Sequence, residues 1–168
     1  MALADTLQGV KNAVDAVSLF MPGNESAHLG EQWAYVASEF FSGGTNPEWT
    51  PAGIDAGRAA FAAAFGNTLP PDPTGAVLIL KLQTAFKAFA DLAAIPANAV
   101  PVSPPAQIPP IQPPPAPMAP ITIPPPSDST EPLAIEIFSK LIAWAPTGLV
   151  SIPNPAGAGP PVPTTPWS

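Results

Sequence analysis

Half of the residues between positions 101 and 126 are proline, thirteen of twenty-six, and none of the others is charged. Proline fixes φ near −65°, lacks a backbone N–H and disfavours helix at the residue before it. Helix is therefore not expected here, and polyproline II is the predicted conformation. At about 3.1 Å per residue, residues 96–129 could span on the order of 100 Å. We expect them to form a proline-rich extended strap.

Large apolar side chains are interspersed with these prolines, which distinguishes the strap from a flexible linker. As a free spacer, the segment would expose its isoleucines to water and reduce solubility. As a ligand of SH3-like domains, it would need a basic residue beside a P-x-x-P core, and it has none. A strap docked onto protein surfaces fits better, because proline lowers the entropy lost on docking and the apolar residues supply contact.

Residues 1–95 are expected to form a small helical bundle. Apolar residues recur at spacings of three and four, which predicts helices over residues 3–20, 25–42, 51–65 and 73–95. The third helix has the strongest signals, because Thr50-Pro51 offers a capping hydroxyl followed by proline at the first helical position, and Gly66-Asn67 closes it.

One face of that third helix carries only small residues: Gly53, Gly57, Ala60 and Ala64. Such a face would let another helix approach closely.

After the strap, the capping residues from Asp128 to Glu131 predict one further helix over residues 130–146. Residues 147–168 are rich in glycine and proline and are expected to form an extended tail. The fold class is therefore mainly α: a small N-terminal bundle, a polyproline-II strap, an anchoring helix and a tail.

The charge content limits the partners. Charged residues make up 10% of the chain, against roughly 25% in a typical soluble domain. A chain with so few charges is expected to bury much of its surface against other proteins or copies of itself. The net charge of −7, with five scattered basic residues, disfavours a nucleic acid partner. Neither a signal peptide nor a membrane span is evident in the sequence.

Catalytic or metal-binding residues are scarce. The one histidine, His28, has Glu25 and Glu31 three residues away on either side. This arrangement permits a weak metal site, but a solvated first helical turn explains it better. The chain has no cysteine and no phosphate-binding glycine loop. We expect no enzymatic activity, no metal and no cofactor.

Two tryptophans, Trp49 and Trp167, lie in proline-flanked extended segments rather than at helical spacings. Buried tryptophans are frequent anchors of extended peptides, so partner docking is favoured over the alternative that they cap the chain's own core. The full set of expected docking residues is Trp49, Ile108, Ile111, Met118, Ile121, Ile123, Trp144 and Trp167.

The segment GGTNPEWTPAGIDAGRAAF at residues 43–61 and the terminal TTPWS resemble, in style, the small Ala/Pro-rich virion proteins of tailed bacteriophages. The resemblance implies a structural role in the tail, baseplate or neck, with other structural proteins of the assembly as partners. It also implies synthesis in the host cytoplasm and a final place in the virion. Alternatives are a capsid decoration or cement protein, or a bacterial cell-surface proline-rich adaptor or binding module.

Overall fold

The computed structural model describes residues 29–44, 47–68, 76–98, 111–122, 125, 131–151 and 164–168. Within them the chain is mainly helical, which confirms the predicted class. The helices are α2 (Leu29–Ser42), α3 (Pro51–Phe65), α4 (Ala76–Asn98) and α5 (Glu131–Trp144), followed by a 3-10 turn at Ala145–Thr147. The strands are β1 (Ile111–Gln112), β2 (Leu149–Ser151) and β3 (Thr164–Pro166). The helix expected over residues 3–20 lies outside the described residues.

Helix α3 has the bounds expected from its capping residues. The Gly53 backbone N–H donates to the Thr50 hydroxyl at 3.0 Å, and Pro51 occupies the first turn. The helix ends where Gly66 adopts a φ of 70° and donates its N–H to the Ala62 carbonyl. Glycine reaches this left-handed region without the penalty that a Cβ would impose.

Helix α4 extends past Pro96, where the sequence predicted that it would end. It runs to Asn98, so the strap begins at least three residues later than expected. The φ of proline is itself helical, and the N–H that proline lacks would have bonded the carbonyl four residues earlier. That residue, Leu92, is 40% exposed.

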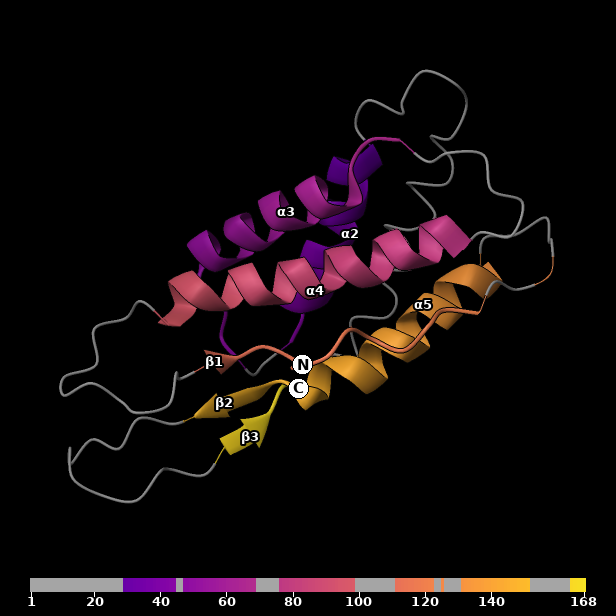
Figure 1. The fold of residues 1–168 in the computed structure, drawn as a ribbon. Helices are drawn as coiled ribbons and strands as arrows, with labels where there is room; N and C mark the ends of the chain where they lie inside the picture. Colours follow the sequence, from indigo (N-terminus) through magenta and orange to yellow (C-terminus); the bar gives the residue numbers. More distant parts are fainter. Residues whose placement is uncertain are drawn as a thin grey trace, which may run out of the picture.

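Helices α3 and α4 pack closely through two of the small residues singled out in the sequence. A Cβ at Gly57 would lie 2.8 Å from the Phe89 ring, and one at Gly53 would lie 2.8 Å from the Ala93 carbonyl oxygen. Helix α2 lies beside α3, and α5 lies on the other side of α4 (Figure 1).

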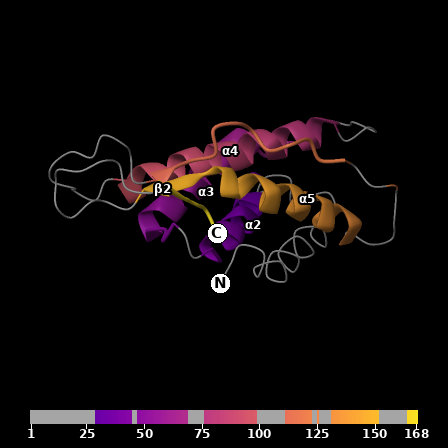
Figure 2. The ribbon, with the colours of Figure 1, turned by 90° about the horizontal axis from the view of Figure 1, so that it is seen from below.

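Residues 111–122 follow α4 and α5 as an extended segment, which we call the strap segment (Figures 1 and 2). It begins with β1, an edge strand of a three-stranded antiparallel sheet in the order β1-β2-β3. Ile111 lies opposite Val150, which lies opposite Thr165 on β3. The sheet was not predicted: the tail was expected to be extended, and the structure pairs parts of it.

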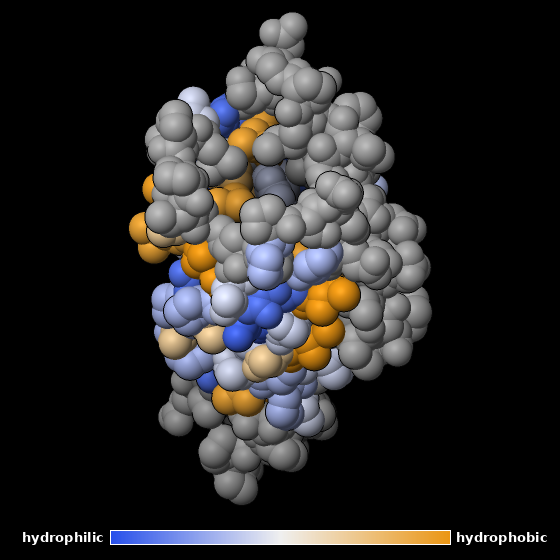
Figure 3. All heavy atoms as spheres, turned by 90° about the vertical axis from the view of Figure 1, so that its right-hand side faces the viewer, coloured by the Kyte–Doolittle hydropathy of each residue, from blue (hydrophilic) through white to orange (hydrophobic). Residues whose placement is uncertain are grey.

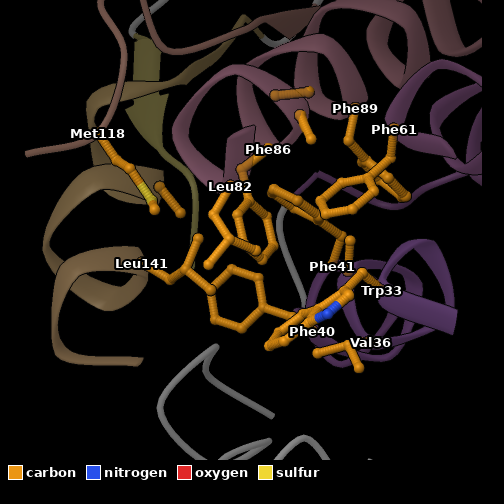
Figure 4. Close-up of a cluster of buried hydrophobic side chains, with 14 of the residues drawn as sticks. Trp33, Val36, Phe40, Phe41, Phe61, Leu82, Phe86, Phe89, Met118 and Leu141 are labelled. Carbon is orange, nitrogen blue, oxygen red and sulfur yellow. The ribbon is translucent and has the colours of Figure 1, made fainter. Parts of the chain in front are cut away.

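The hydrophobic core lies where α2, α3, α4, α5 and the strap segment meet. Aromatic rings dominate it, and Phe41 stacks on Phe89 with ring centroids 4.7 Å apart. Figure 4 shows Met118 of the strap segment pointing towards Leu82 and Leu141, which belong to α4 and α5. The proline-rich segment is therefore part of the core.

Candidate functional site

One side of the strap segment is buried and the other is exposed. The buried residues are Ile111, Pro114, Met118 and Ile121, at successive spacings of three, four and three. These four side chains form the buried side of the segment. The residues between them include prolines that face outward.

Helix side chains hold the backbone of the strap segment. Gln83 Nε2 of α4 donates to the Met118 carbonyl oxygen at 2.7 Å, and Trp144 Nε1 of α5 donates to the Ala116 carbonyl oxygen at 2.6 Å. A proline-rich segment has few N–H donors, but its carbonyls still require partners when buried. Donors on the two helices supply them.

A carboxylate holds the far end of the segment. Glu136 Oε1 accepts the Thr122 backbone N–H at 2.9 Å. This hydrogen bond lowers the pKa of Glu136 below its usual value, because it favours the charged form. Lys140, with its Nζ 3.6 Å from the same oxygen, acts in the same direction.

The C-terminal residues 164–168, which we call the arm, dock beside the end of α5. The Trp167 backbone N–H donates to the Gly148 carbonyl oxygen at 3.1 Å. The indole lies flat against Gly148, where a Cβ would come within 2.4 Å of the ring. Edge-to-face contacts with Trp49 and Phe41, at centroid distances of 5.0 and 6.2 Å, enclose the ring. Trp167 is 1% exposed.

One polar atom of the arm is buried without compensation. The Trp167 indole N–H finds no hydrogen-bond acceptor among the described residues. A buried donor without an acceptor costs about 1–3 kcal/mol. Burial of the apolar ring therefore stabilises the docked arm, and burial of the N–H opposes it.

The expected docking residues are placed in two groups. Ile111, Met118, Ile121 and Trp144 belong to the strap contact, and Trp49 packs against Trp167 in the arm contact. Ile108 and Ile123 lie outside the described residues.

In the structure, the described members of this set contact the chain's own core. Ile111, Met118, Ile121, Trp144 and Trp167 are buried in the chain's own core, and Trp49 is partly buried against it. The physical reason is that side chains of α4 and α5 donate hydrogen bonds to the carbonyls of the strap segment and pack against its apolar residues. For Trp49 and Trp167, this placement corresponds to the alternative of caps on the chain's own core.

Sequence reasoning missed the groups that receive the strap and the arm. Gln83 is one polar residue on an apolar helix, and no local pattern distinguishes it from a solvated glutamine. Gly148 follows Pro146-Thr147 and is indistinguishable from a turn residue. Their roles depend on contacts with residues 35 and 19 positions away, between Gln83 and Met118 and between Gly148 and Trp167.

His28 and Glu25 lie outside the described residues, so the weak metal arrangement around His28 is not described. Among the residues that are described, no three His, Cys, Asp or Glu side chains gather closely enough to hold a metal ion. No helix in the described part of the chain combines the length and apolar character needed to cross a bilayer.

Comparisons with protein-family models, with curated proteins and with solved structures found no match for this chain.

Proposed function

We propose that this chain is a non-enzymatic structural component of a large protein assembly, a bacteriophage virion, with a place in the tail, baseplate or neck. There it would strap neighbouring subunits together. The observation that carries the proposal is the number of large apolar side chains exposed on the helices. They are Tyr35, Leu80, Leu92, Ile95 and Ile135.

Helix α4 carries three of these residues. Leu80 is 65% exposed and Ile95 is 60% exposed, and Leu92 lies one turn before Ile95. Scattered apolar residues are common on protein surfaces, but here charged residues make up only 10% of the chain. Figure 3 shows one face on which hydrophobic residues lie in patches between the polar ones. Burial of these residues against a neighbouring subunit would remove their contact with water.

The polar side chains near the core support a structural role. Gln83, Trp144 and Glu136 each hold the backbone of the strap segment. Lys81 Nζ donates to the Phe65 carbonyl oxygen at 2.6 Å, at the C-terminal end of α3. Each of these four side chains therefore hydrogen-bonds to the backbone of the chain itself.

The finer architecture belongs to the same proposal. A polyproline-II strap would pack along a helical bundle, and its inner side would bind the chain itself. The outer side presents Pro115, Pro117 and Pro120, which are exposed. A rigid, uncharged proline surface loses little conformational entropy on contact with a neighbour, which suits a component that links subunits.

The test is the copy number of the protein in purified particles, measured by quantitative mass spectrometry. We expect a fixed number of copies per particle that survives high-salt washing, since apolar contacts are insensitive to salt screening. Absence from particles, or copies that vary and wash away, would overturn the proposal.

Substitutions on α4 sharpen this experiment. Leu92→Lys and Ile95→Lys together are expected to reduce incorporation at least tenfold, because they place two charges in an apolar contact. The matched control is Ala59→Lys, at an exposed position of α3, a helix that carries no exposed large apolar side chain among the described residues. Equal incorporation of both variants would show that this face of α4 makes no contact in the assembly.

A further inference from the structure

We propose that the arm is exchangeable, so that β3 and Trp167 of one copy occupy the slot beside Gly148 and Trp49 of a second copy. This inference rests on the proposed function, because it names the partner of one contact in the assembly: another copy of this chain. The slot is filled by the chain's own arm in the structure, and the same contacts would form between copies.

The arm is a separable unit. It comprises β3, which lies at one edge of the sheet and pairs with β2 alone, and Trp167, which fills the slot. The receiving groups, Gly148, Trp49 and Phe41, all belong to the rest of the chain. An incoming arm from another copy would meet the same surface.

The length of the connection between β2 and β3 lowers the free-energy cost of exchange. Residues 152–163 number twelve and include five prolines, two glycines and no charge. Tight β-hairpins use two to five residues, and a longer connection holds its two strands together less strongly. Twelve residues can extend at most roughly 40 Å, which is enough to reach an adjacent subunit.

The contact itself is of moderate strength. Burial of the indole is favourable, but the indole N–H has no acceptor among the described residues. A connection of twelve residues corresponds to an effective concentration of the arm in roughly the millimolar range. The arm therefore stays on its own chain in dilute solution, and exchange becomes competitive when copies are crowded to millimolar local concentration, as in an assembly.

Engineered cysteines distinguish the two states, because the chain has no cysteine of its own. Ser151 and Thr164 lie directly opposite each other in the β2–β3 register. A chain carrying both Ser151→Cys and Thr164→Cys should form an intrachain disulfide when dilute, which checks the pairing. A mixture of the two single variants, one of them isotope-labelled, can form the 151–164 disulfide only between chains.

We expect the mixed disulfide to increase with protein concentration from about 10 µM to several millimolar, with its midpoint in the millimolar range set by the effective concentration. Gly148→Ala on the Ser151→Cys chain should reduce the mixed disulfide at least tenfold, because its Cβ would occupy the space of the indole. Trp167→Ala on the Thr164→Cys chain should have the same effect and leaves the receiving slot intact.

A mixed disulfide that is absent throughout this range, or that ignores both substitutions, overturns the exchange. Different results would refute the exchange of the arm and the proposed function. Stoichiometric incorporation into particles without the 151–164 link between chains would refute the exchange alone. Absence from particles would refute the structural role, whatever the arm does in concentrated solution.

Discussion

Trp167→Ala should release the arm and leave the helices folded. The wild-type indole is buried against Gly148, Trp49 and Phe41, and β3 pairs with β2 alone. Without the ring, the arm retains the pairing of β3 with β2 and the hydrogen bond from the residue 167 amide to Gly148. The perturbation is therefore confined to the docking of the arm.

The magnitude follows from the burial of the indole. A buried tryptophan removes about 150–250 Å² from water, which at about 25 cal/mol per Å² corresponds to roughly 4–6 kcal/mol. The indole N–H offsets about 1–3 kcal/mol of this, because it has no acceptor among the described residues. The net loss for Trp167→Ala is therefore about 1–5 kcal/mol, or a roughly 5- to 5,000-fold rise in the undocked population.

Hydrogen exchange of the residue 167 amide measures that population directly, since this N–H donates to the Gly148 carbonyl. We expect exchange to accelerate roughly 5- to 5,000-fold in Trp167→Ala. The matched control is Trp167→Phe, which keeps a ring and removes the unsatisfied N–H, so its exchange should change less than tenfold. An acceleration below threefold in Trp167→Ala would refute the reasoning.

Three further substitutions test other contacts. Gly57→Ala should lower the free energy of unfolding by about 1–3 kcal/mol in urea titration, because its Cβ would lie 2.8 Å from the Phe89 ring. Helix propensity alone predicts a stabilising effect, so an unchanged or higher stability would contradict the close packing of α3 against α4. Gln83→Ala should cost about 0.5–1.5 kcal/mol and speed protease cleavage within the strap segment, whereas Thr84→Ala on the same helix should not speed it. The pKa of Glu136 is lowered in the fold, so the Glu136 carboxylate stabilises the docked strap segment above the unfolded pKa of about 4.3, and this stabilisation is lost as the pH falls through the folded pKa. Acid should therefore release the strap segment near Thr122 in the wild type, and Glu136→Gln should remove this pH dependence. The same pH dependence of the Thr122 NMR signal in both proteins would contradict the role of Glu136.

The sequence was sufficient for the elements whose signals are local. The range of α3 follows from Thr50-Pro51 at one end and Gly66 at the other, because capping and left-handed turns depend on neighbouring residues. The small-residue face also identified Gly53 and Gly57 as a site of close approach. The end of α4 was predicted three residues too early, because Pro96 was interpreted as a stop and the helix continues to Asn98.

The docking of the strap and the arm could not be read from the sequence. Large apolar residues in a proline-rich segment indicate that it docks, but not whether the acceptor surface lies on the same chain. That choice depends on the placement of Gln83 and Trp144 beside the strap and on the contact between Trp49 and Trp167. All these pairs are distant in sequence, so only the assembled fold brings them together.

The central structural claim is that the strap segment, residues 111–122, packs into the chain's own core, and Met118 tests it most directly. The chain has three methionines, Met1, Met21 and Met118, so selective ¹³C-methyl labelling gives a spectrum that single substitutions can assign. In the isolated chain at low concentration, we predict NOEs from the Met118 methyl group to core leucine and aromatic protons, with a chemical shift displaced by ring currents. A Met118 methyl signal at its random-coil position without such NOEs would contradict the account.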